Sequence, residues 1–381
     1  MSIFLFFLIY FSIVFIILNY IYNRLVVFYR QAKFKDPETS KEIDLGEKYD
    51  PFRPHDPINY TQFIIIGLFL FPIRAILCLS ICIGLCIRLK YLRFKYKDID
   101  TNQKASELRV EAIKFWASLF LLVAGISLEK EKIEYEEVYK KYLGPDYDFN
   151  ERKFSCIICN HIGFFDVIAN MSINGCGFMA MKLISGIPIG GDIARDMGSI
   201  FVERLNESSR KESIDYIMLR QQKFYDGQVF NKIVVFPEGT TSNNEYIVKF
   251  KRGVFRCLLP LKPIIIHVDK TAPFHLCSNV TNLFFHVMRC FTCLKNRLFY
   301  AELPIIKPTD YMFEKYAHFG KEKWEIFLNV VKHMYSEMGN FKMTDLGHRD
   351  KDIYYEVLES GIYNVEDSAN HSKIPVKITI K

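Results

Sequence analysis

Hydrophobic positions are distributed unevenly along the chain. Two long apolar runs, at residues 3–22 and 63–87, lie near the N-terminus, and each is long enough for an α-helix to cross the hydrocarbon core of a bilayer. From about residue 150, short apolar runs alternate with segments of helical periodicity. The pattern therefore predicts an N-terminal membrane region followed by a folded domain.

The first run contains only Ser12 and Asn19 as clearly polar interruptions. No cationic segment precedes it and no small-residue cleavage motif follows it, which favours an uncleaved helix or signal anchor over a signal peptide. Several cations follow the run: Arg24, Arg30, Lys33 and Lys35. Because cations favour the cytosolic side of a membrane, we expect the rest of the chain to be cytosolic.

The second run is harder to reconcile with a simple span. Pro72 and Arg74 lie near its middle, where proline interrupts a helix and an arginine in the bilayer is costly. Residues 88–97 then carry five cations, which a span would move to the non-cytosolic side. We therefore expect a re-entrant hairpin over residues 63–87, bent at or near Pro72, with residues 88–97 on anionic headgroups. A single spanning helix kinked at Pro72 is the alternative.

A third apolar stretch, residues 115–128, is too short for a span and is expected to form an interfacial or core helix. We expect a membrane-anchoring region at 1–105, a catalytic domain at 106–345, and a C-terminal helix and tail at 346–381. The tail helix is amphipathic and should end at Gly361.

The folded part has the pattern of an α/β domain. Several of its apolar runs are continuous rather than alternating, as in C-I-I-C and K-I-V-V-F, which indicates strands buried on both faces. The clearest helix between strands is at 208–226. The pattern predicts a mainly parallel central sheet flanked by helices. The expected strands are 154–159, 177–181, 199–202, 232–236, 263–268 and 298–303.

Composition supports a large core, because 50% of the residues are hydrophobic and 15% are aromatic. The net charge is a modest +7, and we expect no nucleic-acid partner. The ten cysteines form no dense framework, so we expect reduced thiols that act as small buried hydrophobes. Zinc is not expected at Cys156/Cys159, which a strand points to opposite faces, nor at Cys290/Cys293, which lie in an apolar stretch.

Candidate chemistry begins with C-N-H-I-G-F-F-D at 159–166, at the carboxyl end of a predicted strand. A histidine there can act as a general base if a carboxylate orients its ring, and Asp166 is close enough in sequence to turn back toward His161. Asp166 could equally cap a helix over residues 167–171. The isolated spacing is common by chance, so it needs further support.

A second motif, F-P-E-G-T-T at 236–241, also follows a predicted strand. Such a turn offers backbone N–H groups and a hydroxyl to a phosphate or an oxyanion, and its candidate residues are Glu238, Gly239 and Thr240. The alternative is an ordinary tight turn.

Two basic segments provide further candidates for binding charged groups. The segment K-F-K-R-G, which contains Lys249 and Lys251, could meet a headgroup or the phosphates of a thioester carrier, or form a solvated basic face. The segment G-S-I-F-V-E-R ends in Glu203 and Arg204, where the arginine suits bidentate phosphate binding. A surface ion pair is the alternative for Glu203 and Arg204.

Together with L-K-P-I-I-I-H at 261–267, these blocks in this order resemble the four characteristic blocks of the glycerolipid acyltransferase superfamily. Finer features resemble its lysophosphatidylcholine and lysophosphatidylethanolamine acyltransferase branch. They are P-F-R-P-H-D at 51–56 with F-P-I-R at 71–74, F-P-E-G-T-T-S-N-N-E-Y at 236–246, and M-T-D-L-G at 343–347. Gly163 replaces the serine common in the histidine block. No D-x-D-x-D-G loop occurs, so calcium control is not expected.

The resemblance implies transfer of an acyl chain from acyl-CoA to a hydroxyl of a lysophospholipid, without a cofactor or metal. His161 would deprotonate the hydroxyl and Asp166 would orient it, while donors near Gly239 and Thr240 stabilise the oxyanion. Arg204 and residues 238–240 would hold the acceptor's phosphate region. The expected location is a membrane, the endoplasmic reticulum by resemblance, with the site at the cytosolic face.

Other functions remain to be weighed against this one. A hydrolase would need a nucleophile, and no G-x-S-x-G elbow occurs in the sequence. An inactive membrane scaffold or lipid-binding protein would not need the intact pair of His161 and Asp166. Glycerol-3-phosphate and lysophosphatidate remain possible acceptors, because the phosphate-binding blocks are shared within the superfamily.

Overall fold

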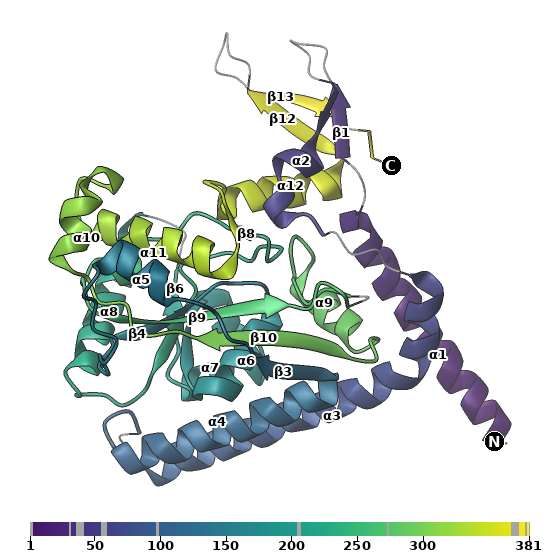
Figure 1. Ribbon diagram of the computed structural model, residues 1–381. Coiled ribbons are helices and arrows are strands. Elements are labelled where there is room, and N and C mark those ends of the chain that lie inside the picture. Colours follow the sequence, from purple (N-terminus) through teal and green to yellow (C-terminus); the bar gives the residue numbers. More distant parts are fainter. Residues whose placement is uncertain are drawn as a thin grey trace.

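A computed structural model describes residues 3–29, 32–35, 42–54, 59–96, 99–203, 207–272, 274–366, 373–377 and 379–380. A central twisted sheet carries helices on both faces, and two long N-terminal helices run along one side and away from it (Figure 1). The α/β class predicted from the apolar runs is confirmed.

The central sheet has seven strands and is mainly parallel. Strands β4, β5, β6, β7 and β9 are parallel to one another, whereas β10 pairs antiparallel with β9 and parallel with β3. All six predicted strands are confirmed, and β3 was not predicted. In spatial order the strands are β3 (Ile126–Lys130), β10 (Asn296–Glu302), β9 (Leu261–Val268), β4 (Cys156–Cys159), β7 (Ile233–Val235), β5 (Gly177–Met181) and β6 (Ile200–Val202).

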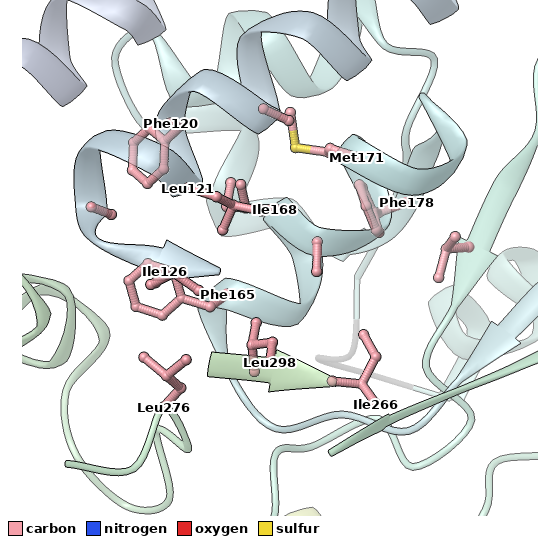
Figure 2. Close-up of a cluster of buried hydrophobic side chains, with 14 of the residues drawn as sticks. Phe120, Leu121, Ile126, Phe165, Ile168, Met171, Phe178, Ile266, Leu276 and Leu298 are labelled. Atoms are coloured by element: carbon pink, nitrogen blue, oxygen red, sulfur yellow. The ribbon is translucent and has the colours of Figure 1, made fainter. Parts of the chain in front are cut away.

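Each face of the sheet is covered by its own hydrophobic core. Along β4, Ile157 and Cys159 face one core, and Cys156 and Ile158 face the other, which explains the continuous apolar run. Figure 2 shows part of the first core, where Phe165 lies near Leu298 of the sheet and Ile168 lies beside Leu121. The first core also contains α4 (Gln103–Ala124), α6 (Phe164–Asn174), α7 (Gly190–Asp196) and α9 (Leu283–Cys290); the second contains α5 (Glu136–Leu143), α8 (Glu207–Tyr225), α10 (Asp310–Lys315) and α11 (Lys323–Gly339).

Two helices, α1 (Ile3–Val26) and α3 (Tyr60–Lys95), are long and apolar enough to cross a membrane. The hairpin expected over residues 63–87 is wrong, because α3 is one helix that runs through Pro72. The proline removes one backbone hydrogen bond, but packing supports the helix on both sides of it. Toward its N-terminus, Gly67 lies against Leu18 of α1, where a Cβ would come within 2.9 Å of the leucine side chain.

Arg74 also points toward the folded domain. Its guanidinium donates hydrogen bonds to the carbonyl oxygens of Cys293 and, at 2.9 Å, Leu294, just beyond the end of α9. The arginine therefore docks α3 against the folded domain by satisfying carbonyl groups at a helix terminus. This contact explains how an arginine is accommodated within an apolar helix.

The stretch at 115–128 was expected to form one interfacial or core helix, but only its first part is helical. Helix α4 ends at Ala124, and Gly125 adopts a left-handed conformation with φ of 76°. The chain then enters β3, which pairs with β10 at the sheet edge. A left-handed glycine at this position ends the helix without the strain that a Cβ would bring.

The C-terminal helix is confirmed as α12 (His348–Ser360), which ends at Gly361 with φ of 71°. It packs on the segment that precedes α3, which includes α2 (Leu45–Lys48). The smaller sheets comprise β1 (Ala32–Lys35), β2 (Glu42–Asp44) and β14 (Thr379–Ile380); β8 (Tyr246–Ile247) and β11 (Lys342–Met343); and β12 (Ile362–Glu366) and β13 (Lys373–Lys377).

All ten cysteines are free, and seven of them are buried. This agrees with reduced thiols that serve as small core residues. Cys156 and Cys159 lie in different cores, on opposite faces of the sheet, as the strand geometry predicts.

Candidate active site

The candidate catalytic loop, residues 160–166, begins where β4 ends. Asn160 continues the pairing with β9 through its side chain, donating to the carbonyl of Ile266 at 2.9 Å and accepting from its N–H at 2.8 Å. The backbone is thereby free to turn away from the sheet. The turn carries His161 to the carboxyl edge, where sites gather in open α/β sheets.

His161 and Asp166 form a direct pair. His161 Nδ1 lies 2.9 Å from Asp166 Oδ2, and the aspartate side chain is fully buried whereas that of the histidine is 20% exposed. A carboxylate at Nδ1 favours the tautomer with the proton on Nδ1. That tautomer leaves Nε2 unprotonated, and no side chain in the described ranges forms a hydrogen bond with Nε2. This is the arrangement that a general base requires.

The side chain of Asp166 also bonds to the backbone at the start of α6. Its Oδ2 accepts the N–H groups of Ile162 at 2.5 Å and Gly163 at 3.1 Å. The expected cap of a helix over residues 167–171 is wrong, because α6 begins at Phe164 and Asp166 is its third residue, which bonds back to the N-cap residue Gly163. Because the carboxylate is fixed by the backbone, it can hold the imidazole in one orientation.

Aromatic packing restrains the histidine ring from one side. The ring stacks on Phe236 with centroids 4.1 Å apart and planes at 16°, and Phe236 in turn lies parallel to Phe178. Phe236 opens the second motif, directly after β7, and β7 is the sheet neighbour of β4. The two motifs therefore meet at adjacent strand ends.

Glu238 links the two motifs from inside the molecule. It is fully buried, and its carboxylate accepts the N–H of His161 at 2.7 Å and that of Val248 at 3.1 Å. Burial raises the pKa of Glu238 to about 8, against the lowering effect of these two donors. Glu238 therefore fixes the backbone of His161, which accounts for a carboxylate beside an expected phosphate site.

The remainder of the turn is also tied to the catalytic loop. Gly239 has φ of 63° and donates its N–H to Phe236 O at 3.0 Å, so that N–H is used in the turn. Thr240 is buried, and the N–H of Ser242 donates to His161 O at 3.0 Å. These bonds hold the residues on either side of Glu238 against the catalytic loop.

Gly163 occupies a position of close backbone approach. A Cβ there would lie 3.1 Å from Ser278 N and 3.2 Å from Leu276 O, in the segment that leads to α9. Ser278 donates its own N–H to Ile162 O at 2.8 Å. The glycine therefore lets this segment close tightly over the catalytic loop.

The remaining predicted residues lie further from the pair or outside the described structure. Glu203 follows β6, which is the third strand along from β4 in the sheet and therefore about 14 Å from it. The Glu203 carboxylate pairs with Lys182 at 2.9 Å. The side chains of Lys249 and Lys251 are exposed near the second motif. Arg204 lies outside the described residues.

The three features that suggested a branch of the superfamily come together around the second motif. Asn243 donates its N–H to Pro51 O and its side-chain amide to Asp50 O, each at 2.8 Å. From the other direction, the N–H of Thr344 donates to Ile247 O at 3.1 Å. Segments far apart in sequence therefore brace one loop.

Several residues of the site were not identified from the sequence alone. Asn160 and Asn244 both bond to Ile266 of β9, yet asparagines in loops are too common to be a signal. Ser278 lies outside every recognised motif. Among the described residues, no group of three or more histidine, cysteine or acidic side chains could hold a metal ion.

Several known proteins are similar to this chain. Residues 147–268 match the family model described as Acyltransferase. A lysophospholipid acyltransferase of Arabidopsis thaliana, LPEAT1, is 24% identical over 212 residues, which cover 55% of this chain and 51% of that protein. Lysophosphatidylcholine acyltransferase 1 of Rattus norvegicus is 32% identical over 108 residues, covering 28% of this chain and 19% of that protein.

Among solved structures, the 1-acyl-sn-glycerophosphate acyltransferase PlsC of Thermotoga maritima matches with a TM-score of 0.41 and 15% identity, covering 69% of this chain and 97% of that one. The match spans about half the length of LPEAT1 and about a fifth of the rat protein.

Proposed function

We propose that the protein is a glycerolipid acyltransferase that transfers an acyl chain from acyl-CoA to the free hydroxyl of a lysophospholipid, because residues 147–268 match the family model described as Acyltransferase. The observation that carries the proposal is the pair of His161 and Asp166 at 2.9 Å, with Nε2 open at the carboxyl edge of the sheet. The names of LPEAT1 and the rat relative support a lysophospholipid as acceptor.

The proposed reaction needs no covalent enzyme intermediate, because a thioester is already activated. Nε2 of His161 takes the proton of the acceptor hydroxyl as its oxygen attacks the thioester carbonyl. The buried carboxylate of Asp166 stabilises the imidazolium that forms. The tetrahedral intermediate then expels the CoA thiolate, which takes the proton back from His161, and the ester product is released.

The charged parts of both substrates need cationic or N–H partners. The exposed side chains of Lys249 and Lys251 are proposed to meet the phosphates of the acceptor or of CoA. Arg204 keeps its proposed role as a phosphate ligand. Since the Gly239 N–H is already bonded within the turn, Thr240 is the stronger candidate for an oxyanion donor.

Helix α3 supports a location at the membrane surface. Two arginines of α3 contact the domain: Arg74 bonds to Leu294 O, and Arg93 pairs with Asp196 of α7 at 2.7 Å. These two contacts lie about 29 Å apart along the helix. A spanning α3 would pull the domain into the hydrocarbon, so we propose that it lies in the plane of one leaflet. The opposite side of the helix exposes Ile65, Phe69, Ile73, Ile76, Ile83 and Ile87. The cytosolic leaflet of the endoplasmic reticulum is the proposed location.

The experiment that tests the proposed function uses the full-length protein, purified in detergent or reconstituted in vesicles, with labelled acyl-CoA. The acceptors are lysophosphatidylcholine, lysophosphatidylethanolamine, lysophosphatidate, glycerol-3-phosphate and water. We expect an acylated product with the first two. Preference for lysophosphatidate or glycerol-3-phosphate would replace the proposed acceptor class. Release of free fatty acid alone would indicate a hydrolase. No turnover with any acceptor would contradict the proposal that the protein is an enzyme.

A further inference from the structure

A lysine of the C-terminal helix reaches the active-site loops and has no part in the mechanism above. Helix α12 is held in place by Tyr354, which stacks on Tyr49 with centroids 5.3 Å apart. Its Lys351 donates to the carbonyl oxygen of Thr241 at 3.3 Å and also to Thr241 Oγ1. Thr241 ends the F-P-E-G-T-T motif, so α12 contacts the second motif directly through a charged group.

From Thr241 a chain of hydrogen bonds continues to the catalytic loop. Ser278 Oγ donates to Thr241 Oγ1 at 3.0 Å, and the Ser278 N–H donates to Ile162 O at 2.8 Å. Ile162 is the residue after His161, and its own N–H bonds to Asp166. The lysine is therefore linked through four hydrogen bonds to the carboxylate that contacts His161.

The surroundings of the ammonium group make a purely structural role a poor explanation. Asp352 on α12, Glu238 and Cys277 lie near enough to influence Lys351 electrostatically, and Lys351 in turn influences His286 of α9. Burial lowers the pKa of Lys351 to about 7. Lys351 is partly buried, and withdrawing a cation from water costs stability that an apolar side chain of similar length would not.

We propose that Lys351 is a positioning residue for acyl transfer: its ammonium group holds Thr241, and through Thr241 and Ser278 it fixes the loop that carries His161 and Asp166. The role in turnover rests on the proposed function, whereas the role in ordering the loop does not. Lys351 touches no reacting atom in this account and acts through the residues that it holds.

The test compares Lys351→Met, which keeps the length of the side chain without charge, and Lys351→Arg, which keeps the charge. Arg349→Met is the matched control, because it removes one cation from an exposed position of the same helix. In Lys351→Met we expect kcat to fall by about tenfold or more with a KM for acyl-CoA close to wild type, since small misplacement of a base is costly. Lys351→Arg should recover part of the loss, and Arg349→Met should match wild type.

The pH profile separates positioning from simple stabilisation. Wild-type kcat should fall as pH rises through about 7, where Lys351 loses its proton. This alkaline fall in kcat should move to higher pH in Lys351→Arg and be absent from the residual activity of Lys351→Met. An alkaline limb shared by all three proteins would overturn the assignment.

A second readout does not depend on turnover. Hydrogen–deuterium exchange of the peptides that contain Ile162, Ser242 and Ser278 should be faster in Lys351→Met than in wild type and Arg349→Met. Wild-type exchange together with wild-type kcat in Lys351→Met would overturn the proposal. If neither wild type nor any variant transfers acyl groups, the proposed function fails, and the exchange rates alone test whether Lys351 orders the loop. If Lys351→Met does not fold, the pH profiles of wild type and Lys351→Arg decide.

Discussion

At the residue scale, the site depends on carboxylates that are bonded to the backbone. Asp166 accepts two N–H groups and the imidazole, and Glu238 accepts two N–H groups from separate segments. Such carboxylates are rigid because several donors fix each one. The geometry of the candidate site is therefore fixed by the loops themselves.

Glu238 gives a prediction for stability. In Glu238→Gln the amide oxygen can accept only one of the two N–H groups, and the amide NH2 faces the other. We expect the free energy of unfolding to fall by about 1–3 kcal/mol, the cost of leaving a buried donor without an acceptor. Thermal or denaturant unfolding in detergent measures it, with Glu245→Gln, on the same loop, as the control.

The pH dependence of this difference follows from the raised pKa. A carboxyl whose pKa rises from 4.5 to about 8 on folding binds more protons in the folded state between these values. The contribution of this raised pKa to the free energy of unfolding is therefore full below about pH 4.5 and is lost as pH rises through 8. The stability of wild type relative to Glu238→Gln should decline from pH 5 to 8. A constant difference over that range would contradict protonation of Glu238 in the folded protein.

At the scale of elements, the strands and helix α1 were predictable and the path of α3 was not. Continuous apolar runs such as C-I-I-C identify buried strands directly, because both faces of the sheet are covered. The path of α3 depends instead on what packs against it. Pro72 and Arg74 both suggested a bend, but α1 and the end of α9 supply contacts that the local sequence does not encode. In the same way, Gly125 divides an apolar stretch that looks continuous.

Arg74 provides the test at this scale. In Arg74→Met the carbonyl oxygens of Cys293 and Leu294 lose their donors, so α3 should separate more easily from the end of α9. We expect a lower melting temperature in detergent, by an amount equivalent to about 1–3 kcal/mol for charged hydrogen bonds. Arg88→Met, on the same helix but with no hydrogen bond described, should melt like wild type. Equal melting of both variants and wild type would mean that the contact does not anchor α3.

At the scale of the whole molecule, the candidate site draws on the full length of the chain. Residues near 50, 161, 240, 278 and 351 meet at one edge of the sheet, and only the central motifs could be recognised as functional from sequence. Loop residues such as Ser278 and Lys351 carry no local pattern, since their role depends on tertiary contacts. Figure 1 shows α12 and α2 side by side above the sheet, although they come from opposite ends of the chain.

The in-plane orientation of α3 gives a prediction at this scale. Cysteines introduced singly by Asn59→Cys and Lys95→Cys lie just before the start and at the end of α3. In sealed vesicles of defined orientation, a membrane-impermeant thiol reagent added on one side should label both variants or neither. Opposite labelling would mean that α3 spans the bilayer. Wild type, whose cysteines are buried or partly buried, sets the background.

The most direct test of the central claim is the turnover of His161→Ala with labelled acyl-CoA and the acceptor that the wild-type protein prefers. We expect kcat to fall by about 10²–10⁴-fold, the usual contribution of a general base, with the melting temperature and the KM for acyl-CoA close to wild type. His318→Ala, at an exposed histidine, is the control and should keep full activity. Wild-type kcat in His161→Ala would contradict the account.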